Sequence, residues 1–301
     1  MIVSVIIPTC NRNDLLAKCL DLLSPAIQKK GAWDYEVVVT DDSNTNMAKS
    51  LIESRYPWVK WVQGPRKGPA ANRNYGAKQV AGEWLVFIDD DCLPVTDIIY
   101  QYQKAILEHP QAGAFEGAIV PDDERLVLKD MAECPVNKDG GYFWTANVCI
   151  KKECFEKVNG FDEDFILAAH EDQILYLRLK EITTIPFIPT IKVIHPVRFI
   201  ALKTKIKNNR KKLRNWLIYT QKKQLPFSTA IKEALNAQVR ELVHHTLQLK
   251  PKNAILNLYT LFISLPALMI RQTLHPAQKQ MVNKPVLKND LHASEKHSAH
   301  L

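Results

Sequence analysis

Short runs of apolar and β-branched residues alternate with segments of helical spacing along residues 2–120. The strand-like runs are IVSVII (2–7), YEVVVT (35–40), VKWV (59–62), EWLVFI (83–88) and AGAFEGAIV (112–120). Between them, apolar spacing predicts helices over 14–29, 70–81 and 95–108. This alternation predicts an α/β fold with a mainly parallel sheet flanked by helices. A ligand crevice is expected beyond the carboxyl ends of the strands.

Polar residues follow three of the predicted strands where each strand ends. They are PTCN (8–11), DDSN (41–44) and DDDC (89–92), and a doubly wound sheet would bring them to one crevice. Adjacent carboxylates repel one another, so a fold that keeps three of them at 89–91 requires a cation. A single aspartate after a strand is commonly a helix cap. Three in succession favour a divalent ion that shares its shell with substrate phosphates, because no Walker A or GxGxxG loop follows a strand.

Charge is distributed unevenly along the chain. Residues 1–195 carry 21 Lys and Arg against 28 Asp and Glu, whereas residues 196–301 carry 19 against 4. The basic excess predicts a module that faces a polyanion, either nucleic acid or an anionic membrane surface. No recognised nucleic-acid-binding motif accompanies the charge, so nucleic acid is not expected as a partner.

The basic part of the chain has its own helical pattern. An amphipathic helix is predicted over 201–223, with Leu202, Ile206, Leu213 and Leu217 on one stripe. It is interpreted either as a solvated helix on the core or as a membrane-surface helix. A second amphipathic segment covers 229–249.

The apolar run at 254–270 has 17 residues, fewer than the roughly 20 that span a bilayer. An interfacial, re-entrant or buried helix is therefore predicted. Together these patterns predict a catalytic domain over 1–195, a helical extension over 196–275 and a disordered tail over 276–301.

Cysteine usage bears on the compartment. The six cysteines form neither a CxxC pair nor a regular framework, which indicates reduced thiols in the cytoplasm. The N-terminal MIVSVIIP lacks a basic leader and is too short for a membrane helix, so it is interpreted as the first strand.

Several motifs in order resemble those of the family 2, GT-A-type nucleotide-sugar glycosyltransferases. The resemblance covers roughly residues 2–195 and implies a Rossmann-like GT-A catalytic domain. The motifs are VSVIIPTCNR, VVVTDDSN, GPAANRNYGAKQVAGEWLVFIDDDCLP, WTANVCIKKECFEKVNGFDEDF and HEDQILYLRLK.

The resemblance implies roles for individual residues in substrate binding. It places Pro8, Thr9, Asn11, Asp41 and Asp42 against the nucleotide base and ribose, and Arg73 near the nucleotide. Asp90, Trp144 and Glu171 are further expected substrate contacts. Aromatic rings cover the apolar faces of sugars, so Tyr142 and Trp144 could line an acceptor site. Core packing is an equal interpretation for Phe143 and Trp144.

The resemblance also implies a metal site and a base. Its DxD motif maps to Asp89 and Asp91 as ligands of Mg²⁺ or Mn²⁺, and its ED motif maps Asp172 to the general base. His195 either completes the metal site or is an ordinary loop histidine, and His170 is expected to contact the acceptor or the loop backbone. Glycosyl transfer needs charge stabilised on the leaving diphosphate and a proton taken from the acceptor, and a metal and a carboxylate supply these.

Two positions depart from the family pattern. A second acid after the ED pair is replaced by Ile174, and a commonly aromatic position after the first strand is Cys10. These departures leave the base assignment standing but weaken what can be inferred about acceptor contacts and base stacking.

The function predicted from these residues is that of an inverting, metal-dependent glycosyltransferase. It would move a sugar from a nucleotide-sugar donor to a saccharide or lipid-linked acceptor, in polysaccharide, glycolipid or cell-surface glycan synthesis. The expected location is the cytoplasm, or the periphery of the membrane on its cytoplasmic face. One alternative is a metal-dependent nucleotidyltransferase that uses GPRKGPAANR (64–73) as a phosphate clamp. The other is a non-catalytic binding protein with a GT-A fold.

Overall fold

The computed structural model describes residues 3–28 and 34–274. The chain divides into two compact units, which are Met1–Asp122 with Cys134–Pro196, and Asp123–Glu133 with Val197–Leu301. The prediction for 276–301 lies outside the described residues. A single boundary at residue 195 did not anticipate that 123–133 would belong with the helices that follow the sheet.

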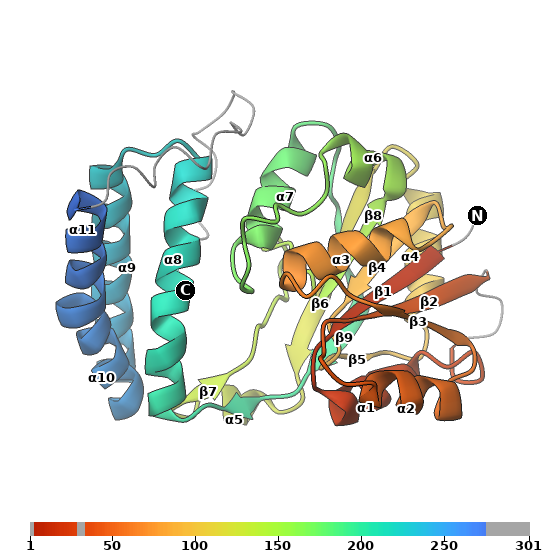
Figure 1. The fold of residues 1–301 in the computed structure, drawn as a ribbon, viewed down its shortest axis with the longest axis horizontal. Coiled ribbons are helices and arrows are strands. Elements are labelled where there is room, and N and C mark those ends of the chain that lie inside the picture. The colour runs from red at the N-terminus through yellow and green to blue at the C-terminus, as the bar shows by residue number, and fades with distance from the viewer. Residues whose placement is uncertain (1–2, 29–33, 275–301) are drawn as a thin grey trace. The chain divides into compact units, whose positions relative to one another are not determined.

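An eight-stranded sheet in the order β3-β2-β1-β4-β8-β6-β9-β5 forms the centre of the first unit (Figure 1). Strands β1, β2, β3 and β4 are mutually parallel, whereas β8 runs antiparallel to β4 and β6 and β5 runs antiparallel to β9. The bounds are β1 Val3–Thr9, β2 Tyr35–Asp41, β3 Val59–Gln63, β4 Trp84–Ile88, β5 Leu93–Pro94, β6 Ala114–Pro121, β8 Asn147–Lys151 and β9 Phe187–His195. The predicted α/β class is confirmed, with more antiparallel pairing than the sequence pattern suggested.

Helices cover both faces of this sheet. Alternate residues of β1 point to opposite faces, so Val5 and Ile7 join one core cluster and Ile6 joins the other. The first cluster includes residues of α1, α2 and α4, and the second includes residues of α3, α6 and α7. Because both faces are buried, the strands read as continuous apolar runs. The helices are α1 Asn13–Leu22, α2 Met47–Arg55, α3 Pro69–Lys78, α4 Ile98–Glu108, α6 Lys152–Lys157 and α7 Glu171–Lys180.

Proline and glycine residues set the limits and the packing of helices α1 and α3. Helix α1 ends at Leu22 rather than at residue 29, because the residue before Pro25 disfavours helical backbone. Helix α3 begins with Pro69 after Gly68, and it packs closely on the sheet. A Cβ on Gly76 would meet Ile6 Cγ2 at 2.6 Å, so only glycine permits this approach. The close packing holds the preceding turn of α3, which carries Arg73, against the strand ends.

The second unit consists mainly of helices. Its long elements are α8 Leu202–Lys222, α9 Phe227–Leu247, α10 Pro251–Tyr259, the π-helical turn η1 Thr260–Ser264 and α11 Leu265–Leu274. Trp216, Leu217, Ile231 and Leu265 form part of its core. The segment 123–133 contains α5 (Glu124–Val127) and is attached in two ways. Its strand β7 (Ala132–Glu133) pairs with β10 (Arg198–Phe199), and Asp130 accepts hydrogen bonds from the backbone at the start of α10.

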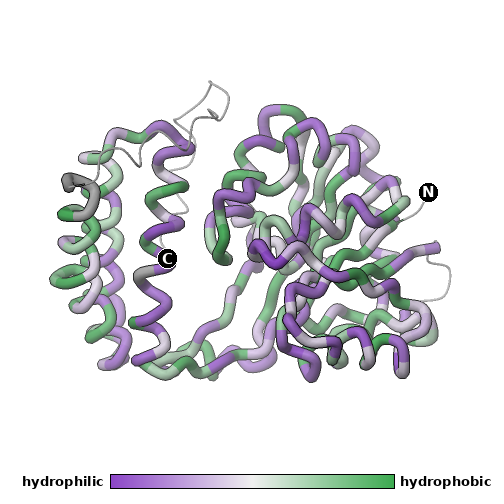
Figure 2. Tube along the Cα trace, viewed as in Figure 1, coloured by the Kyte–Doolittle hydropathy of each residue, from purple (hydrophilic) through white to green (hydrophobic). Residues whose placement is uncertain are grey.

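The apolar segment of this unit is longer than predicted. The continuous helix begins at Pro251, and its apolar part runs through the π-helical turn to Ile270, which gives 20 residues; 28% of an 18-residue window within it is buried. By length and composition this helix could cross a membrane, which corrects the expectation that the run is too short. A core helix of a soluble protein would pass the same test. Figure 2 shows that hydrophobic residues predominate along α10 and α11, whereas hydrophilic and hydrophobic residues alternate along α8.

Candidate active site

The polar residues after β1, β2 and β4 meet at one end of the sheet because these strands are parallel neighbours. The backbone N–H of Asp42 donates to Thr9 O at 2.9 Å. The Thr9 hydroxyl donates to Asp90 Oδ2 at 2.7 Å, across 81 residues of sequence. The convergence expected from the strand pattern is therefore present, and it gathers acidic side chains at this end of the sheet, where the crevice was expected.

Two arginines provide the positive charge that the three adjacent carboxylates require. Arg73 lies 2.7 Å from Asp89 Oδ1 and 3.2 Å from Glu171 Oε1, with only 5% of its side chain exposed. Arg12 lies 2.6 Å from Asp90 Oδ1 and 3.0 Å from Asp91 Oδ2, with 40% of its side chain exposed. Burial opposes the charge of Asp89, but Arg73 outweighs this effect and lowers the pKa of that carboxyl. Arg12 was missed by the sequence reasoning, although it stands in the quoted motif PTCNR.

Asp90 is the middle carboxylate of the aspartate run. It is completely buried and contacts Thr9 and Arg12. Burial raises the pKa of Asp90 to about 7, although Arg12 and the Thr9 hydroxyl oppose this shift. The substrate contact expected for Asp90 stays a prediction; in the structure its carboxylate contacts Thr9 and Arg12.

A possible metal-binding group lies at the other end of the aspartate run. Ligand atoms of Asp91, Cys92 and His195 all lie within 4.8 Å of one another, and His195 Nε2 is 3.6 Å from Asp91 Oδ1. His195 Nδ1 is 3.1 Å from Pro196 O, an arrangement that leaves Nε2 directed toward the aspartate.

Two of these three side chains, Asp91 and His195, suit a hard divalent cation and were predicted as ligands. The third, Cys92, was not predicted. Carboxylate and imidazole groups suit Mn²⁺ and Mg²⁺, whereas burial raises the pKa of the Cys92 thiol well above its ordinary value and keeps it protonated. Asp89, predicted as a ligand, is paired with Arg73 and does not belong to this group. The metal-ligand roles of Asp89, Asp91 and His195 stay predictions, and of these three residues Asp91 and His195 are the two that lie in this group.

The ED pair begins helix α7. Glu171 Oε2 accepts the backbone N–H of Ala169 at 2.7 Å, while its other oxygen faces Arg73. Asp172 Oδ1 accepts the backbone N–H of Gln173 at 2.8 Å. Burial, and next the charge of Glu171, raise the pKa of Asp172 well above the ordinary aspartate value. A raised pKa makes this carboxylate a stronger base, and the general-base role of Asp172 stays a prediction. His170 Nδ1 lies 2.8 Å from Gln173 Oε1.

The residues after β2 form the wall of the expected nucleotide site. Asp41 is completely buried and accepts the backbone N–H of Ser43 at 2.8 Å, and it also accepts the Ser43 hydroxyl. Asp42 accepts the backbone N–H groups of Arg66 at 2.9 Å and Gly68 at 3.2 Å. Burial raises the pKa of Asp42. Pro8 is buried and Asn11 is exposed with φ 55°, so these predicted contacts differ in how far they reach solvent.

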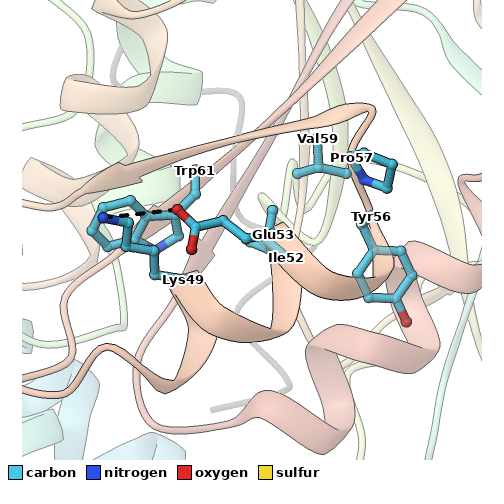
Figure 3. Close-up of a pocket in the computed structure, with 7 residues that line it drawn as sticks. All are labelled: Lys49, Ile52, Glu53, Tyr56, Pro57, Val59 and Trp61. Atoms are coloured by element: carbon cyan, nitrogen blue, oxygen red, sulfur yellow. Dashed lines mark ion pairs between the residues drawn. The ribbon is translucent and has the colours of Figure 1, made fainter.

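Trp61 is a second residue that the sequence reasoning missed. Its indole Nε1 donates to Asp41 Oδ2 at 3.4 Å, and its ring lines a surface hollow on α2 and β3 (Figure 3). The hollow is lined by Lys49, Ile52, Glu53, Tyr56, Pro57, Val59 and Trp61. Its lining includes none of Asp89, Asp90 and Asp91, and Trp61 connects the hollow to Asp41.

A buried glutamate organises the predicted acceptor wall. Glu116 on β6 accepts the backbone N–H groups of Gly141 at 2.6 Å and Tyr142 at 2.9 Å, and also that of Phe143. Phe143 is completely buried, which confirms the core interpretation for this ring. Tyr142 and Trp144 stack with ring centroids 4.6 Å apart and both remain partly exposed. The sequence feature that could have identified Glu116 is its position as an acid in the middle of the apolar run AGAFEGAIV.

The mixed sheet, flanked by helices and with acidic residues at its strand ends, is consistent with the fold of GT-A enzymes. The model of the glycosyl transferase family 2 matches residues 4–139. Over this segment the chain is similar to glycosyl transferase family 2.

Relatives and a solved structure agree with this similarity. A GalNAc(5)-diNAcBac-PP-undecaprenol beta-1,3-glucosyltransferase of Campylobacter jejuni is 36% identical over 29% of this chain and 29% of its own. A validoxylamine A glucosyltransferase of Streptomyces hygroscopicus is 29% identical over 59% of this chain and 48% of its own. The chain thus spans half or less of the length of these relatives.

The fold is similar to that of mannosyltransferase PcManGT from Pyrobaculum calidifontis, solved in complex with GDP-Man and Mn²⁺. The TM-score is 0.54 at 20% identity, over 91% of this chain and 79% of that one. The predicted GT-A fold is therefore confirmed.

Proposed function

We propose that this protein is an inverting, metal-dependent glycosyltransferase that transfers a sugar from a nucleotide-sugar donor to an acceptor hydroxyl. The observation that carries the proposal is the ion-pair chain Asp89–Arg73–Glu171. It joins the aspartate run of the donor crevice to the acid beside Asp172, across 98 residues between Arg73 and Glu171. A donor at the strand ends and a base at the start of α7 would then face the same reacting carbon.

The residues of the crevice have distinct tasks in this proposal. Asp42 and the loop that it holds through Arg66 and Gly68 bind the base and ribose. Asp91 and His195 would hold Mn²⁺ or Mg²⁺, which when bound offsets the charge of the leaving diphosphate. Asp172 takes the proton of the acceptor hydroxyl as that oxygen attacks the anomeric carbon. A single displacement of this kind inverts the configuration at that carbon.

The named ligands of the relatives guide the proposed substrates. GDP-Man and Mn²⁺ are bound by the Pyrobaculum enzyme, and the Campylobacter relative is named for an undecaprenol-linked acceptor. We therefore infer a nucleoside diphosphate sugar as donor and a saccharide or lipid-linked saccharide as acceptor, in glycan synthesis. All six cysteines are free, which supports work on the cytoplasmic side.

Product analysis tests the proposal. Full-length protein with Mn²⁺, a panel of nucleotide sugars and a panel of free and polyprenyl-linked saccharides is expected to release nucleoside diphosphate and to form a glycosylated acceptor. Chromatography of the nucleotide products distinguishes the alternatives. Release of pyrophosphate would indicate a nucleotidyltransferase, while failure to bind UDP or GDP in the presence of Mn²⁺ would indicate a non-catalytic GT-A protein.

The second unit supports a proposal about location. Exposed basic residues project from α8, at Lys203, Lys207, Lys211 and Arg214. Exposed apolar residues follow on the next helices and on the turn between α9 and α10. The first three are spaced four residues apart along α9 and so lie on one stripe. The exposed apolar residues are Val239, Val243, Leu247, Leu249, Ile255, Leu258, Phe262 and Ile263. Basic charge together with insertable apolar side chains is the combination that stable attachment to a membrane surface requires. We propose that this unit binds an anionic membrane surface and presents lipid-linked acceptors.

Sedimentation with vesicles tests this attachment. Full-length protein is expected to sediment with anionic phosphatidylglycerol vesicles, and about 0.5 M salt is expected to weaken this by screening. Changing Lys203, Lys207 and Lys211 together to glutamate removes charges that contribute about 1 kcal/mol each near such a surface, so most protein should stay in the supernatant. The matched control changes Lys18, Lys78 and Lys104, which are exposed in the first unit. Equal sedimentation of both variants, or none by wild type at low salt, would refute membrane docking.

A further inference from the structure

The two arginines of the acidic crevice differ in how firmly they are held. Arg73 is buried on α3 and its two ion-pair partners come from β4's following turn and from α7. Arg12 precedes α1 and leaves 40% of its side chain exposed. Its backbone carbonyl accepts the N–H groups of Leu15 and Leu16 at 3.1 and 3.0 Å. The backbone of Arg12 is therefore anchored, while its guanidinium can exchange partners at the crevice surface.

Arg12 occupies the carboxylate that is best placed to bind a metal. Its Nη1 lies 3.0 Å from Asp91 Oδ2, and His195 Nε2 lies 3.6 Å from Asp91 Oδ1. A divalent cation between Asp91 and His195 would approach a guanidinium of like charge. Repulsion between like charges at such short range is strong in a partly buried site. The ion and Arg12 therefore compete for Asp91.

We propose that Arg12 is a displaceable counter-ion, which neutralises Asp90 and Asp91 in the empty enzyme and moves to the donor diphosphate when metal and donor bind. The inference rests on the proposed function, because it assumes a metal and a diphosphate in this crevice. A guanidinium forms bidentate hydrogen bonds to phosphate as well as to carboxylate. The diphosphate can thus pair with the Arg12 guanidinium when the metal binds Asp91.

This exchange couples the two ligands. Without donor, a metal that binds Asp91 displaces the Arg12 guanidinium, and the guanidinium gains no new anionic partner. With donor bound, the diphosphate receives the guanidinium and the metal meets less competition. Nucleoside diphosphate should therefore raise the affinity for Mn²⁺, and Mn²⁺ should raise the affinity for the nucleotide by the same factor.

Titration of free Mn²⁺ by electron paramagnetic resonance tests the exchange on full-length protein, alone and with UDP or GDP. Arg12→Gln is expected to bind Mn²⁺ alone about 5-fold or more tightly than wild type, and to lose a similar factor of the nucleotide-induced gain. Arg12→Lys keeps the charge but lacks the fork, so its values should fall between the two. Arg55→Gln is the matched control, because it removes an arginine from an exposed ion pair with Asp21, and it should titrate as wild type.

The outcomes separate this inference from the function on which it rests. Unchanged or weaker Mn²⁺ binding by Arg12→Gln, with normal nucleotide-dependent binding in wild type, overturns the displaceable counter-ion and leaves the glycosyltransferase proposal standing. Absence of Mn²⁺ binding in every variant, even with UDP or GDP, rejects the metal site itself and the counter-ion with it. Tighter binding by both Arg12→Gln and Arg55→Gln would show a general charge effect and would also overturn the inference.

Discussion

Replacing Asp172 by asparagine is expected to lower kcat roughly 10²-fold or more, which is the usual scale for general acid–base catalysis, while donor affinity stays close to wild type. Asparagine can still accept the Gln173 N–H that Asp172 accepts at 2.8 Å, so the first turn of α7 should persist. What is lost is the ability to take a proton. Turnover at saturating substrate and calorimetry with UDP or GDP measure the two effects separately.

The same substitution should not destabilise the fold. Burial and Glu171 raise the pKa of Asp172, so its contribution to stability is present below the unfolded aspartate pKa and is lost as pH rises through the folded value. Above that value the buried charge disfavours folding, and Asp172→Asn is expected to match or exceed the wild-type Tm there. In wild type, turnover should fall as pH drops through the raised pKa, because the base becomes protonated.

The test of Asp172→Asn needs a control variant on the same protein. Asp21→Asn changes an exposed aspartate of α1 and should leave turnover unchanged. If donor affinity in Asp172→Asn drops by the same factor as turnover, Asp172 supports the nucleotide site rather than the chemistry.

Replacing Asp91 by asparagine is expected to abolish metal-dependent donor binding. Asp91 is the carboxylate that lies between His195 and Arg12, and a neutral amide attracts a divalent ion far less. Loss of an outer-shell partner already costs roughly 10- to 100-fold in metal affinity, so loss of a direct ligand should cost at least that much. Calorimetry with UDP or GDP, with and without Mn²⁺, measures the loss.

Asp97→Asn is a suitable control for this variant, since Asp97 precedes α4 and contacts Gln101. It should bind nucleotide and Mn²⁺ as wild type does. Wild-type affinity and turnover in Asp91→Asn would show that Asp91 is not a metal ligand.

Local patterns predicted much of the sheet and its helices. The apolar runs that became β1, β2 and β4 could be recognised because both faces of these strands are buried. The antiparallel β8 was not predicted as a strand. Its apolar core, Val148 to Ile150, is short, and its place between β4 and β6 depends on pairing with residues far away in the chain.

Site residues were harder to predict where contacts are distant. Arg73 was expected near the nucleotide from its motif, but its pairing with both Asp89 and Glu171 depends on how α3 and α7 pack. Glu116 and Trp61 were missed for the same reason. Each acts on a loop or carboxylate at least 20 residues away, the separations being 20 for Trp61 and Asp41 and 25 for Glu116 and Gly141.

The sequence by itself determined that three adjacent carboxylates follow a buried strand, and that their mutual repulsion requires positive charge nearby. Only the tertiary structure decided which groups supply that charge. Arg12 reaches Asp90 and Asp91 because β1 and β4 are paired in parallel, and Arg73 reaches Asp89 because α3 packs against β1 and β2. The energy of an ion pair depends on the distance between its charges, and chain folding sets that distance between residues that the sequence leaves far apart.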